Sequence, residues 1–425
     1  MSELWRRPFV DPLYRTIEFD ENLLALVRTA VVQRLRHVRL SNIDSIDIPS
    51  IANLSRFEHV LGVAHLAEKV GFRSGLSGYD HLVLKSSALL HDWAITSFGH
   101  LVEEALQYVG TRFDHEEKLS QILTGQTFDD IGGADMQILA GRETGLRGWA
   151  RRAAGADGHQ LLLDIMDHIR GRGRMGRVIA GDIDLDNIDN VFRMAFHMGI
   201  PVNREIPGRI AAAIVGVVED VGEPVFRVSA EADIENWRET RRQVYESLML
   251  AERDFIGKLM ILFATIKAYE HNEISSNDWN LVDYQFVERL LNSPTREVQE
   301  TAKRWIAGEL WHGTPLHWLD GERPEYPKLL ELSGLLTGSL GRHCFAYAIK
   351  DKRDRRLSIS YDDGSRRVYG TTPRQWLLGV GSTVSRAFTI GETRKVFDIA
   401  ASMFGTRVIA PALKPSEGEE QPCLF

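Results

Sequence analysis

Cysteine is scarce in this chain of 425 residues, which contains only Cys344 and Cys423. Two cysteines cannot form a disulfide framework, so we expect a protein of the reducing cytoplasm. Residues 1–8 lack the apolar run of a signal peptide, and no uninterrupted apolar stretch is long enough to cross a bilayer. The sequence therefore predicts a cytoplasmic protein without a membrane partner.

Net positive charge is also lacking, because 51 lysines and arginines stand against 59 aspartates and glutamates, giving a formal charge of -8 at pH 7. This balance excludes an overall basic field for nucleic acid, although an enzyme acting on phosphates would still need a local basic groove. The hydrophobic content of 44% and the charged content of 26% are those of an ordinary folded protein. At this length we expect more than one domain.

Apolar residues at helical spacing dominate the first part of the chain. They predict helices over residues 23–39, 56–67, 82–90, 101–109, 116–123 and 161–169, and one long helix over 237–270. Ser55 is a suitable N-cap for the second of these helices. Residues 210–218 look extended because they contain several β-branched side chains.

The pattern changes in the last third of the chain. Residues 343–368 alternate apolar and polar side chains around a turn at 362–365, which predicts a β-hairpin. Residues 382–404 return to a helical pattern. The glycine-rich stretch 379–384 lacks the lysine of a phosphate-binding loop, so a turn at the start of a helix is the favoured interpretation.

The most informative stretch is 88–100, an apolar helix that ends at His91 and Asp92. This pair offers one nitrogen and one oxygen ligand on a rigid support, but a lone His-Asp pair is common by chance. His59 and Asp186 extend the set to two imidazoles and two carboxylates. Such a set suits a divalent transition ion with open positions for water and phosphate, which implies phosphoester hydrolysis.

Several separated motifs occur in the order found in a known family. They are the Asp11-Pro12 box, the helix 33–38, the run 56–63 (Arg-Phe-Glu-His-Val-Leu-Gly-Val), His91-Asp92 and the run 184–189 (Asp-Leu-Asp-Asn-Ile-Asp). Over about residues 9–260 the chain thus resembles the HD-domain metal-dependent phosphohydrolases, in the branch that contains the deoxynucleoside triphosphate triphosphohydrolases. The resemblance implies metal-dependent hydrolysis of a nucleotide.

The resemblance also implies roles for particular residues. The metal ligands would be His59, His91, Asp92 and Asp186, holding one divalent ion of manganese, iron, zinc, nickel or magnesium. Arg56 would face the nucleotide. Arg241 looks similar to an arginine that meets the phosphate chain, although a surface salt bridge explains Arg241 equally well.

A second group would handle protons. His100 and Glu103 are at the helical spacing i, i+3, so they can share a face. His115 falls where the family places another active-site histidine. A histidine beside a carboxylate can protonate a leaving oxygen while the carboxylate orients the ring. We therefore expect His115 with Glu103 to be the general acid, with His100 as a possible substitute.

The chain departs from the family at positions that face the substrate. Ile95 stands where the family has a catalytic histidine. Asn187, Asn190 and Met194 stand where it often has a lysine, a tyrosine and an aspartate, and Leu40-Ser41 stands where it has Gln-Leu under the sugar. Methionine is a poor partner for a sugar hydroxyl. We expect Leu40, Ser41, Asn187 and Asn190 to line a pocket built for a different substrate or a different pose.

The fold that these observations predict is mainly α. An HD-domain helical core covers residues 1–275, and a smaller mixed α/β C-terminal region over 276–410 is expected to support a homo-oligomer. The tail 411–425 is rich in proline, serine, glycine and glutamate and is predicted to be disordered.

Three functions stay open at this point. The first is a metal-dependent nucleotide phosphohydrolase. The second is a phosphatase or phosphodiesterase acting on another phosphoester or on a nucleic-acid end. The third, suggested by Ile95, is a regulatory protein that keeps the metal and the fold but has lost catalysis, and that binds a nucleotide or nucleic acid.

Overall fold

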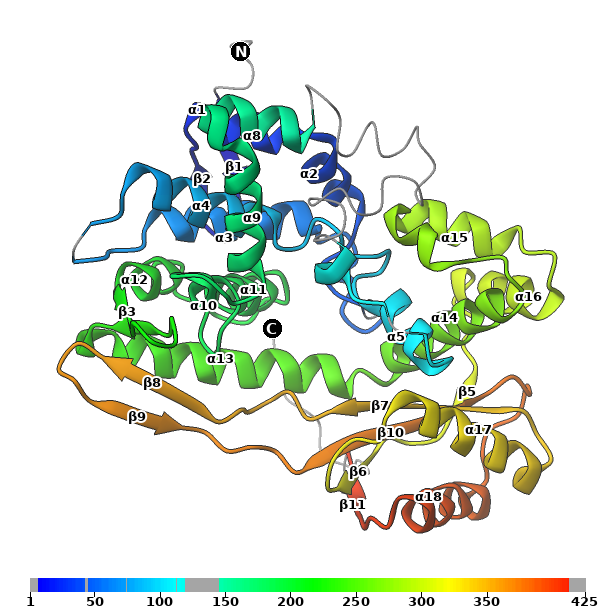
Figure 1. Cartoon of the computed structure of the whole chain (residues 1–425). Helices are drawn as coiled ribbons and strands as arrows, with labels where there is room; N and C mark the ends of the chain where they lie inside the picture. The colour runs from blue at the N-terminus through cyan, green and yellow to red at the C-terminus, as the bar shows by residue number, and fades with distance from the viewer. Residues whose placement is uncertain (1–6, 43–44, 74, 112, 119–144, 413–425) are drawn as a thin grey trace.

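The computed structural model describes residues 7–42, 45–73, 75–111, 113–118 and 145–412 (Figure 1). The chain is mainly α with a smaller strand-containing region, as predicted. Parts of the predicted helix 116–123 and of the predicted tail 411–425 lie outside the described residues. Within the described parts, no helix is both long enough and apolar enough to cross a membrane.

Two short strands and several helices open the chain. They are β1 (Phe9–Asp11), β2 (Arg15–Ile17), α1 (Glu21–Val27), α2 (Ala30–Arg34) and 3₁₀ turns at Leu35–His37 and Pro49–Ile51. The single helix predicted over 23–39 is therefore broken. Thr29 is the N-cap of α2, and its side chain is committed to the carbonyl of Leu26. The chain turns there because that hydroxyl satisfies a carbonyl at the end of α1.

The helical core follows. It contains α3 (Arg56–Glu68), α4 (Gly78–Leu90), α5 (Leu101–Tyr108), α8 (Leu146–Ala154), α9 (Gly158–Ile169), α10 (Gly176–Ile179), α11 (Leu185–His197) and α12 (Ile206–Ala212). The Ser55 hydroxyl accepts the Glu58 amide at 3.3 Å, which confirms the predicted N-cap of α3. Helix α3 packs against both α4 and α11. These three helices carry the candidate site.

Glycine at position 62 allows α3 and α11 to approach closely. A Cβ atom at Gly62 would lie 2.1 Å from Asp189 Oδ1 and 2.2 Å from Arg193 Nη2. A larger residue would push α11 away from α3. Position 62 therefore fixes the spacing of two of the helices that form the site.

The long helix predicted over 237–270 is in fact two helices, α13 (Glu231–Leu250) and α14 (Glu252–Glu270). The break lies at Ala251, whose ψ is 89°. Asp47 accepts the Arg253 amide at 2.9 Å, and the carboxylate of Asp254 in turn accepts the amides of Ile46 and Asp47. Because this loop supplies a cap, a new helix can start without loss of hydrogen bonding.

A four-stranded sheet joins distant parts of the chain. Its order is β3 (Ile214–Val217), β4 (Pro224–Phe226), β8 (Leu357–Tyr361) and β9 (Arg366–Tyr369). The hairpin predicted around 362–365 is confirmed as β8 and β9, and β4 runs parallel to β8. Residues 210–218 are extended only from Ile214, since α12 ends at Ala212. The sheet crosses the boundary predicted between 275 and 276, and that boundary stays a prediction.

The second large sheet belongs to the C-terminal third. Its path is β11 (Val408–Pro411), β6 (His317–Asp320), β10 (Gln375–Ser382) and β5 (His312–Gly313), with β7 (Cys344–Lys350) also paired to β10. The nearby helices are α15 (Asp283–Leu291), α16 (Arg296–Ile306), α17 (Tyr326–Leu340) and α18 (Ile390–Phe404). In Figure 1, α13 and α14 lie between the helical core and these strands.

The turn predicted at 379–384 is wrong for residues 379–382, which belong to β10. A Cβ atom at Gly379 would lie 2.5 Å from Phe255 of α14. A Cβ atom at Gly381 would likewise lie 2.9 Å from Leu259 of α14. Glycine at these two positions allows β10 to lie directly on α14. The following helix begins only at Ile390, because the Thr389 hydroxyl accepts the Glu392 amide and caps it there.

Candidate metal centre and cavity

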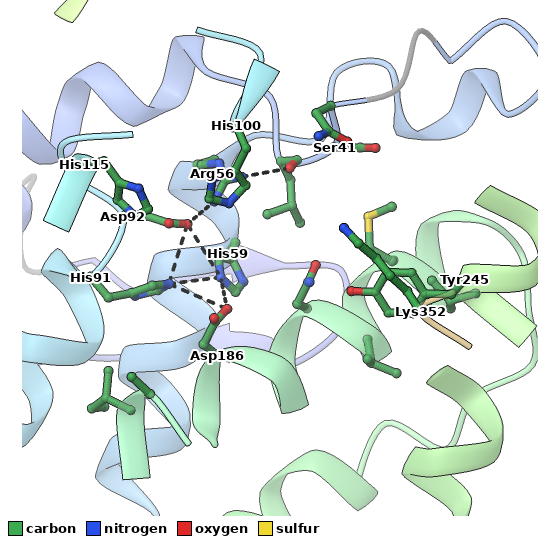
Figure 2. A pocket seen from close by; sticks show the side chains of 18 of the residues that line it. Ser41, Arg56, His59, His91, Asp92, His100, His115, Asp186, Tyr245 and Lys352 are labelled. Atoms are coloured by element: carbon green, nitrogen blue, oxygen red, sulfur yellow. Dashed lines mark hydrogen bonds and ion pairs between the residues drawn. The ribbon is translucent and has the colours of Figure 1, made fainter. Parts of the chain in front are cut away.

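Three helix ends converge on a cavity of about 300 Å³ (Figure 2). His59 lies in the first turn of α3, His91 is the C-cap of α4, and Asp186 is in the first turn of α11. Each helix is fixed by its buried apolar face. The three side chains are therefore held in place by packing and do not depend on a loop.

The donor atoms of these side chains meet at one point. His59 Nε2 lies 3.3 Å from His91 Nε2 and 3.0 Å from Asp186 Oδ1, and His91 Nε2 lies 3.7 Å from Asp186 Oδ1. Donors that each stand about 2.1 Å from one ion are separated by roughly 3.0 to 3.4 Å. The three residues could therefore hold a single metal ion with little movement.

The fourth predicted ligand, Asp92, lies beside this group. Its Oδ2 is 3.5 Å from His91 Nε2 and 3.9 Å from His59 Nε2. The same carboxylate forms a buried ion pair with Arg56. Burial opposes its charge, but Arg56 and the imidazoles hold the pKa of Asp92 well below its usual range. Asp92 is thus an anion that faces the donor group.

The opposite nitrogens of both imidazoles are already engaged. His59 Nδ1 is 2.7 Å from Asp189 Oδ2, and His91 Nδ1 is 2.8 Å from the carbonyl of Ala88. Each Nδ1 therefore donates a hydrogen bond, which leaves the lone pair on Nε2 directed at the meeting point. Burial lowers the pKa of His91, but Asp92 and Asp186 outweigh it and raise that pKa to about 9. The two carboxylates thus favour a positive charge at this point, which is either a proton on His91 Nε2 or a divalent transition ion bound by the two imidazoles.

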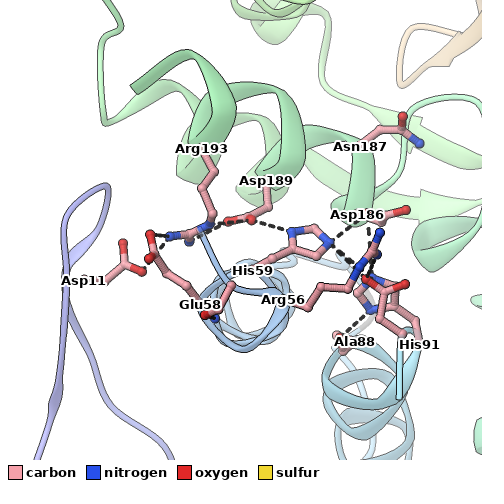
Figure 3. A network of polar contacts seen from close by, with 12 residues as sticks. Asp11, Arg56, Glu58, His59, Ala88, His91, Asp186, Asn187, Asp189 and Arg193 are labelled. Atoms are coloured by element: carbon pink, nitrogen blue, oxygen red, sulfur yellow. Dashed lines mark hydrogen bonds and ion pairs between the residues drawn. The ribbon is translucent and has the colours of Figure 1, made fainter. Parts of the chain in front are cut away.

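A network of charged side chains contacts His59 on its Nδ1 side, away from the metal-binding nitrogen (Figure 3). Arg193 is fully buried and donates to Asp189 at 2.8 and 2.9 Å, to Asp11 at 2.8 Å and to Glu58 at 2.6 Å. Burial raises the pKa of Asp189, but Arg193 and His59 bring it below its usual value. Sequence reasoning did not identify Asp189 or Arg193. Their spacing of four residues on α11 was the available signal, and it resembles an ordinary surface ion pair.

The residues predicted to handle protons, His100, Glu103 and His115, also lie together in the structure. Glu103 lies between two imidazoles, with Oε2 2.6 Å from His100 Nδ1 and Oε1 2.8 Å from His115 Nδ1. The His115 amide donates to the same Oε1 at 2.9 Å. Burial lowers the pKa of His115, but Glu103 outweighs it and raises that pKa above its ordinary value. His100 and His115 both line the cavity (Figure 2).

Ile95 does not line the cavity. Its side chain is fully buried in the apolar core, and it is not among the residues that line the cavity. His100, the N-cap of α5, and His115, in the segment after α5, supply imidazoles to the cavity. The cavity therefore has two imidazoles near the metal-binding side chains even though position 95 is an isoleucine.

The predicted substrate-binding residues are placed differently from one another. Leu40, Ser41, Asn190 and Arg56 line the cavity. Asn187 does not line it, because its side-chain amide donates to Asp184 at 2.9 and 3.1 Å. This contact supports the N-cap of α11. The structure therefore does not support the prediction that the Asn187 side chain lines the pocket.

Arg241 is not a surface residue. Only 8% of it is exposed, and its guanidinium lies 4.3 Å from the ring centroid of Tyr245. Its Nε and Nη1 atoms have no hydrogen-bond partner in the parts of the chain that the structure describes. Tyr245 lines the cavity. Arg241 thus stacks on Tyr245, a residue of the cavity wall, without lining the cavity itself.

Part of the cavity wall is apolar. Met194 of α11 meets Val244 of α13 in a small cluster with Leu40, and Leu248 packs against it. All four residues line the cavity. Sequence reasoning singled out Leu40 and Met194 but missed Val244 and Leu248 on α13 and also Lys352. They lie far along the chain from the motifs, and only the fold brings them to the site.

Comparison with known proteins gives two distant similarities, and no family model matches the chain. A protein of Methanocaldococcus jannaschii named uncharacterized protein MJ1154 is 23% identical over 375 residues, which are 85% of this chain and 74% of that protein. A Dictyostelium discoideum protein named deoxynucleoside triphosphate triphosphohydrolase SAMHD1 homolog is 24% identical over 202 residues. This second match covers 44% of this chain and only 36% of the relative's own length. The chain is thus similar in part to a protein named for nucleotide hydrolysis.

Proposed function

We propose that this chain is a metal-dependent phosphohydrolase that acts on a nucleotide. The observation that carries the proposal is the convergence of His59 Nε2, His91 Nε2 and Asp186 Oδ1 beside a cavity. When bound there, a divalent ion would polarise a phosphoryl oxygen and lower the pKa of a bound water. Asp186 is the most open of the three, with 37% of its side chain exposed, so substrate would enter on its side.

The proton transfer belongs to His115 and Glu103 in this proposal. The contact between His115 Nδ1 and Glu103 leaves His115 Nε2 available to donate a proton to a leaving oxygen. Glu103 holds the ring and stabilises its charged form. His100 shares the same carboxylate but is about half exposed, so we assign the general-acid role to His115.

Nucleotides are the substrate class favoured by the partial similarity to the Dictyostelium protein. The finer proposal is hydrolysis of a deoxynucleoside triphosphate to a nucleoside and triphosphate, with manganese as the first ion to test. Binding of nucleic acid, assembly into a homo-oligomer and a cytoplasmic location stay predictions.

A second function is favoured by the apolar wall formed by Met194, Val244 and Leu248. A sugar hydroxyl placed against these side chains would lose its hydrogen bonds, which disfavours a standard nucleotide pose. A phosphatase or phosphodiesterase that accepts a less polar ester fits this wall better. The products separate the two functions, since the second releases inorganic phosphate or a cleaved diester.

The test is a panel of nucleotides and simple phosphoesters incubated with the purified full chain and Mn²⁺, Fe²⁺, Zn²⁺, Ni²⁺ or Mg²⁺, with identification of products. We expect turnover of a nucleotide that is abolished in His91→Ala and kept in His159→Ala, whose histidine is exposed and outside the cavity. Absence of any turnover that depends on His91 would overturn the proposal. Nucleotide binding without product would favour the regulatory protein.

A further inference from the structure

Asn42 is a cavity residue that the proposed mechanism does not use. It lines the cavity together with Arg56 and His100. A Cβ atom at Gly99 would lie 3.8 Å from the Asn42 Cβ atom and 2.9 Å from Arg56 Nη2, so Gly99 is close to both residues. Asn42 thus stands beside the backbone that carries His100 into the cavity.

The side-chain amide of Asn42 has a defined direction. Its Nδ2 atom donates to Glu104 Oε1 at 3.4 Å. An ionised carboxylate only accepts hydrogen bonds, so the amide nitrogen, and not the amide oxygen, faces Glu104. The Oδ1 atom stands at the other end of the planar amide. Asn42 therefore presents an acceptor on the side that is turned away from Glu104.

Two buried residues hold Glu104 in place. The Nζ atom of Lys258 on α14 lies 2.9 Å from Glu104 Oε2 and 3.2 Å from Oε1. The hydroxyl of Tyr347 on β7 donates to Oε2 at 3.0 Å. Burial and the charge of Glu104 raise the pKa of Tyr347 well above its ordinary value, so this hydroxyl stays protonated. Lys258, Tyr347 and Asn42 are thus all donors to this carboxylate.

This network prevents the Asn42 amide from turning over. A turned amide would place Oδ1 against the Glu104 carboxylate and replace a hydrogen bond by the repulsion of two acceptors. The network is itself fixed by the apolar core, since Phe255 of α14 packs on Tyr347 with ring centroids 5.2 Å apart. The acceptor on Asn42 is therefore oriented before any substrate binds.

We propose that Asn42 Oδ1 accepts a hydrogen bond from a hydroxyl or amino group of the substrate, on the His100 side of the cavity. The proposal rests on the proposed function and narrows its substrates to phosphoesters that carry such a donor. In a nucleotide the donor is a sugar hydroxyl or an exocyclic amine of the base. The apolar wall of Met194, Val244 and Leu248 would face a part of the substrate without donors.

The kinetic test uses pairs of triphosphates that differ by one donor, with Mn²⁺. The pairs are guanosine and 2′-deoxyguanosine, 2′-deoxyguanosine and 2′,3′-dideoxyguanosine, guanosine and inosine, and adenosine and purine riboside. In the unaltered chain we expect loss of the recognised donor to lower kcat/KM about 3- to 10-fold. In Asn42→Ala that ratio should fall to about one, because the acceptor is gone. Ratios that are the same in both proteins would overturn the proposal.

The variant Asn42→Asp tests the direction of the amide. It keeps oxygen acceptors but removes the donor, and its added charge weakens binding of all these nucleotides alike, so the ratio within a pair is the informative quantity. We expect Asn42→Asp to keep the ratio that Asn42→Ala loses. A ratio lost in both variants would show that Asn42 donates to the substrate, which contradicts the proposal.

The matched controls are Asn277→Ala and Asn277→Asp, at an exposed asparagine that does not line the cavity. Both should behave as the unaltered chain does in every pair. Thermal unfolding of each variant verifies the fold.

A binding measurement keeps this test separate from that of the proposed function. Calorimetry with the same triphosphates on His115→Ala, with and without the further change Asn42→Ala, needs no turnover. We expect the affinity ratio within the recognised pair to be lost together with Asn42. Such a loss supports the Asn42 contact even where no nucleotide is hydrolysed. Affinity ratios that do not depend on Asn42, or no binding of any of these nucleotides, contradict it.

Discussion

His59 shows how much of the site depends on single residues outside the metal-binding group. Asp186 contacts its Nε2 and Asp189 contacts its Nδ1 from the same face of α11, three positions apart. The sequence predicted the first contact through the motif order. It could not predict the second, because Asp189 followed by Arg193 has the spacing of a surface ion pair. Burial distinguishes the two cases, and burial is set by the packing of α3 on α11.

Substitution of Asp189 tests this support. In Asp189→Asn the side chain keeps its size but loses the charge that fixes His59, so we expect Mn²⁺ affinity to fall about 10- to 100-fold. Metal titration of the purified protein measures the change. Asp220→Asn, at an exposed position, is the matched control and should bind as the unaltered chain does. Unchanged affinity in Asp189→Asn would show that the network does not act on the metal centre.

Glu103 sets the pH dependence of the proposed general acid. Glu103 raises the pKa of His115 against the effect of burial, so the protonated form persists above the ordinary histidine value. Activity should be full below this raised pKa and fall as pH rises through it. In Glu103→Gln we expect the falling limb to move to lower pH and kcat to drop about 10²- to 10⁴-fold.

The pH–rate profile of Glu103→Gln is compared with that of Glu117→Gln, whose side chain is exposed. Metal content should be equal in both. A falling limb that stays in place in Glu103→Gln would contradict the role of His115.

At the scale of elements, the predictions were best where a cap or a turn is encoded locally. Ser55 caps α3 and the turn at 362–365 joins β8 to β9, both as predicted. The break at Ala251 was missed because the apolar pattern continues across it. Its cause, the contact of Asp47 with the start of α14, lies about two hundred positions away in the sequence. The spacing of apolar residues within one segment does not reveal a contact with a residue so distant in the sequence.

Gly62 offers a test of the spacing between α3 and α11. Gly62→Ala would force a Cβ atom against Asp189 and Arg193, so we expect a loss of about 1–3 kcal/mol in unfolding free energy and weaker metal binding. Gly334→Ala, on an exposed face of α17 with open space around it, should be neutral or gain up to about 1 kcal/mol. Thermal and denaturant unfolding compare them. Equal stability of the two variants would show that the helices tolerate a wider spacing.

At the scale of the whole molecule, the C-terminal third takes part in the core. Phe263 of α14 packs on Phe345 of β7 with ring centroids 5.5 Å apart, and β4 pairs with β8. The compositional change near residue 343 correctly predicted strands there. It could not show that these strands pack on α14 or that β8 pairs with β4, because contacts between elements far apart in the chain leave no pattern in the sequence near either element.

This packing predicts the behaviour of a fragment that ends at residue 275. Helix α14 is buried on nearly all its faces, and removal of β7 and β10 would expose Phe255, Leu259 and Phe263. We expect the fragment to aggregate or to unfold without a cooperative transition, as followed by circular dichroism. A fragment that unfolds cooperatively and binds Mn²⁺ would instead support an independent domain over 1–275.

The stoichiometry of metal binding is the most direct test of the metal centre. Elemental analysis and Mn²⁺ titration of the full chain should give one ion per chain, and the ion should be lost in His91→Ala and in Asp186→Ala. His159→Ala, at an exposed histidine, should keep it. A chain that binds none of manganese, iron, zinc or nickel, or that binds equally well in all three variants, would contradict a metal centre at His59, His91 and Asp186.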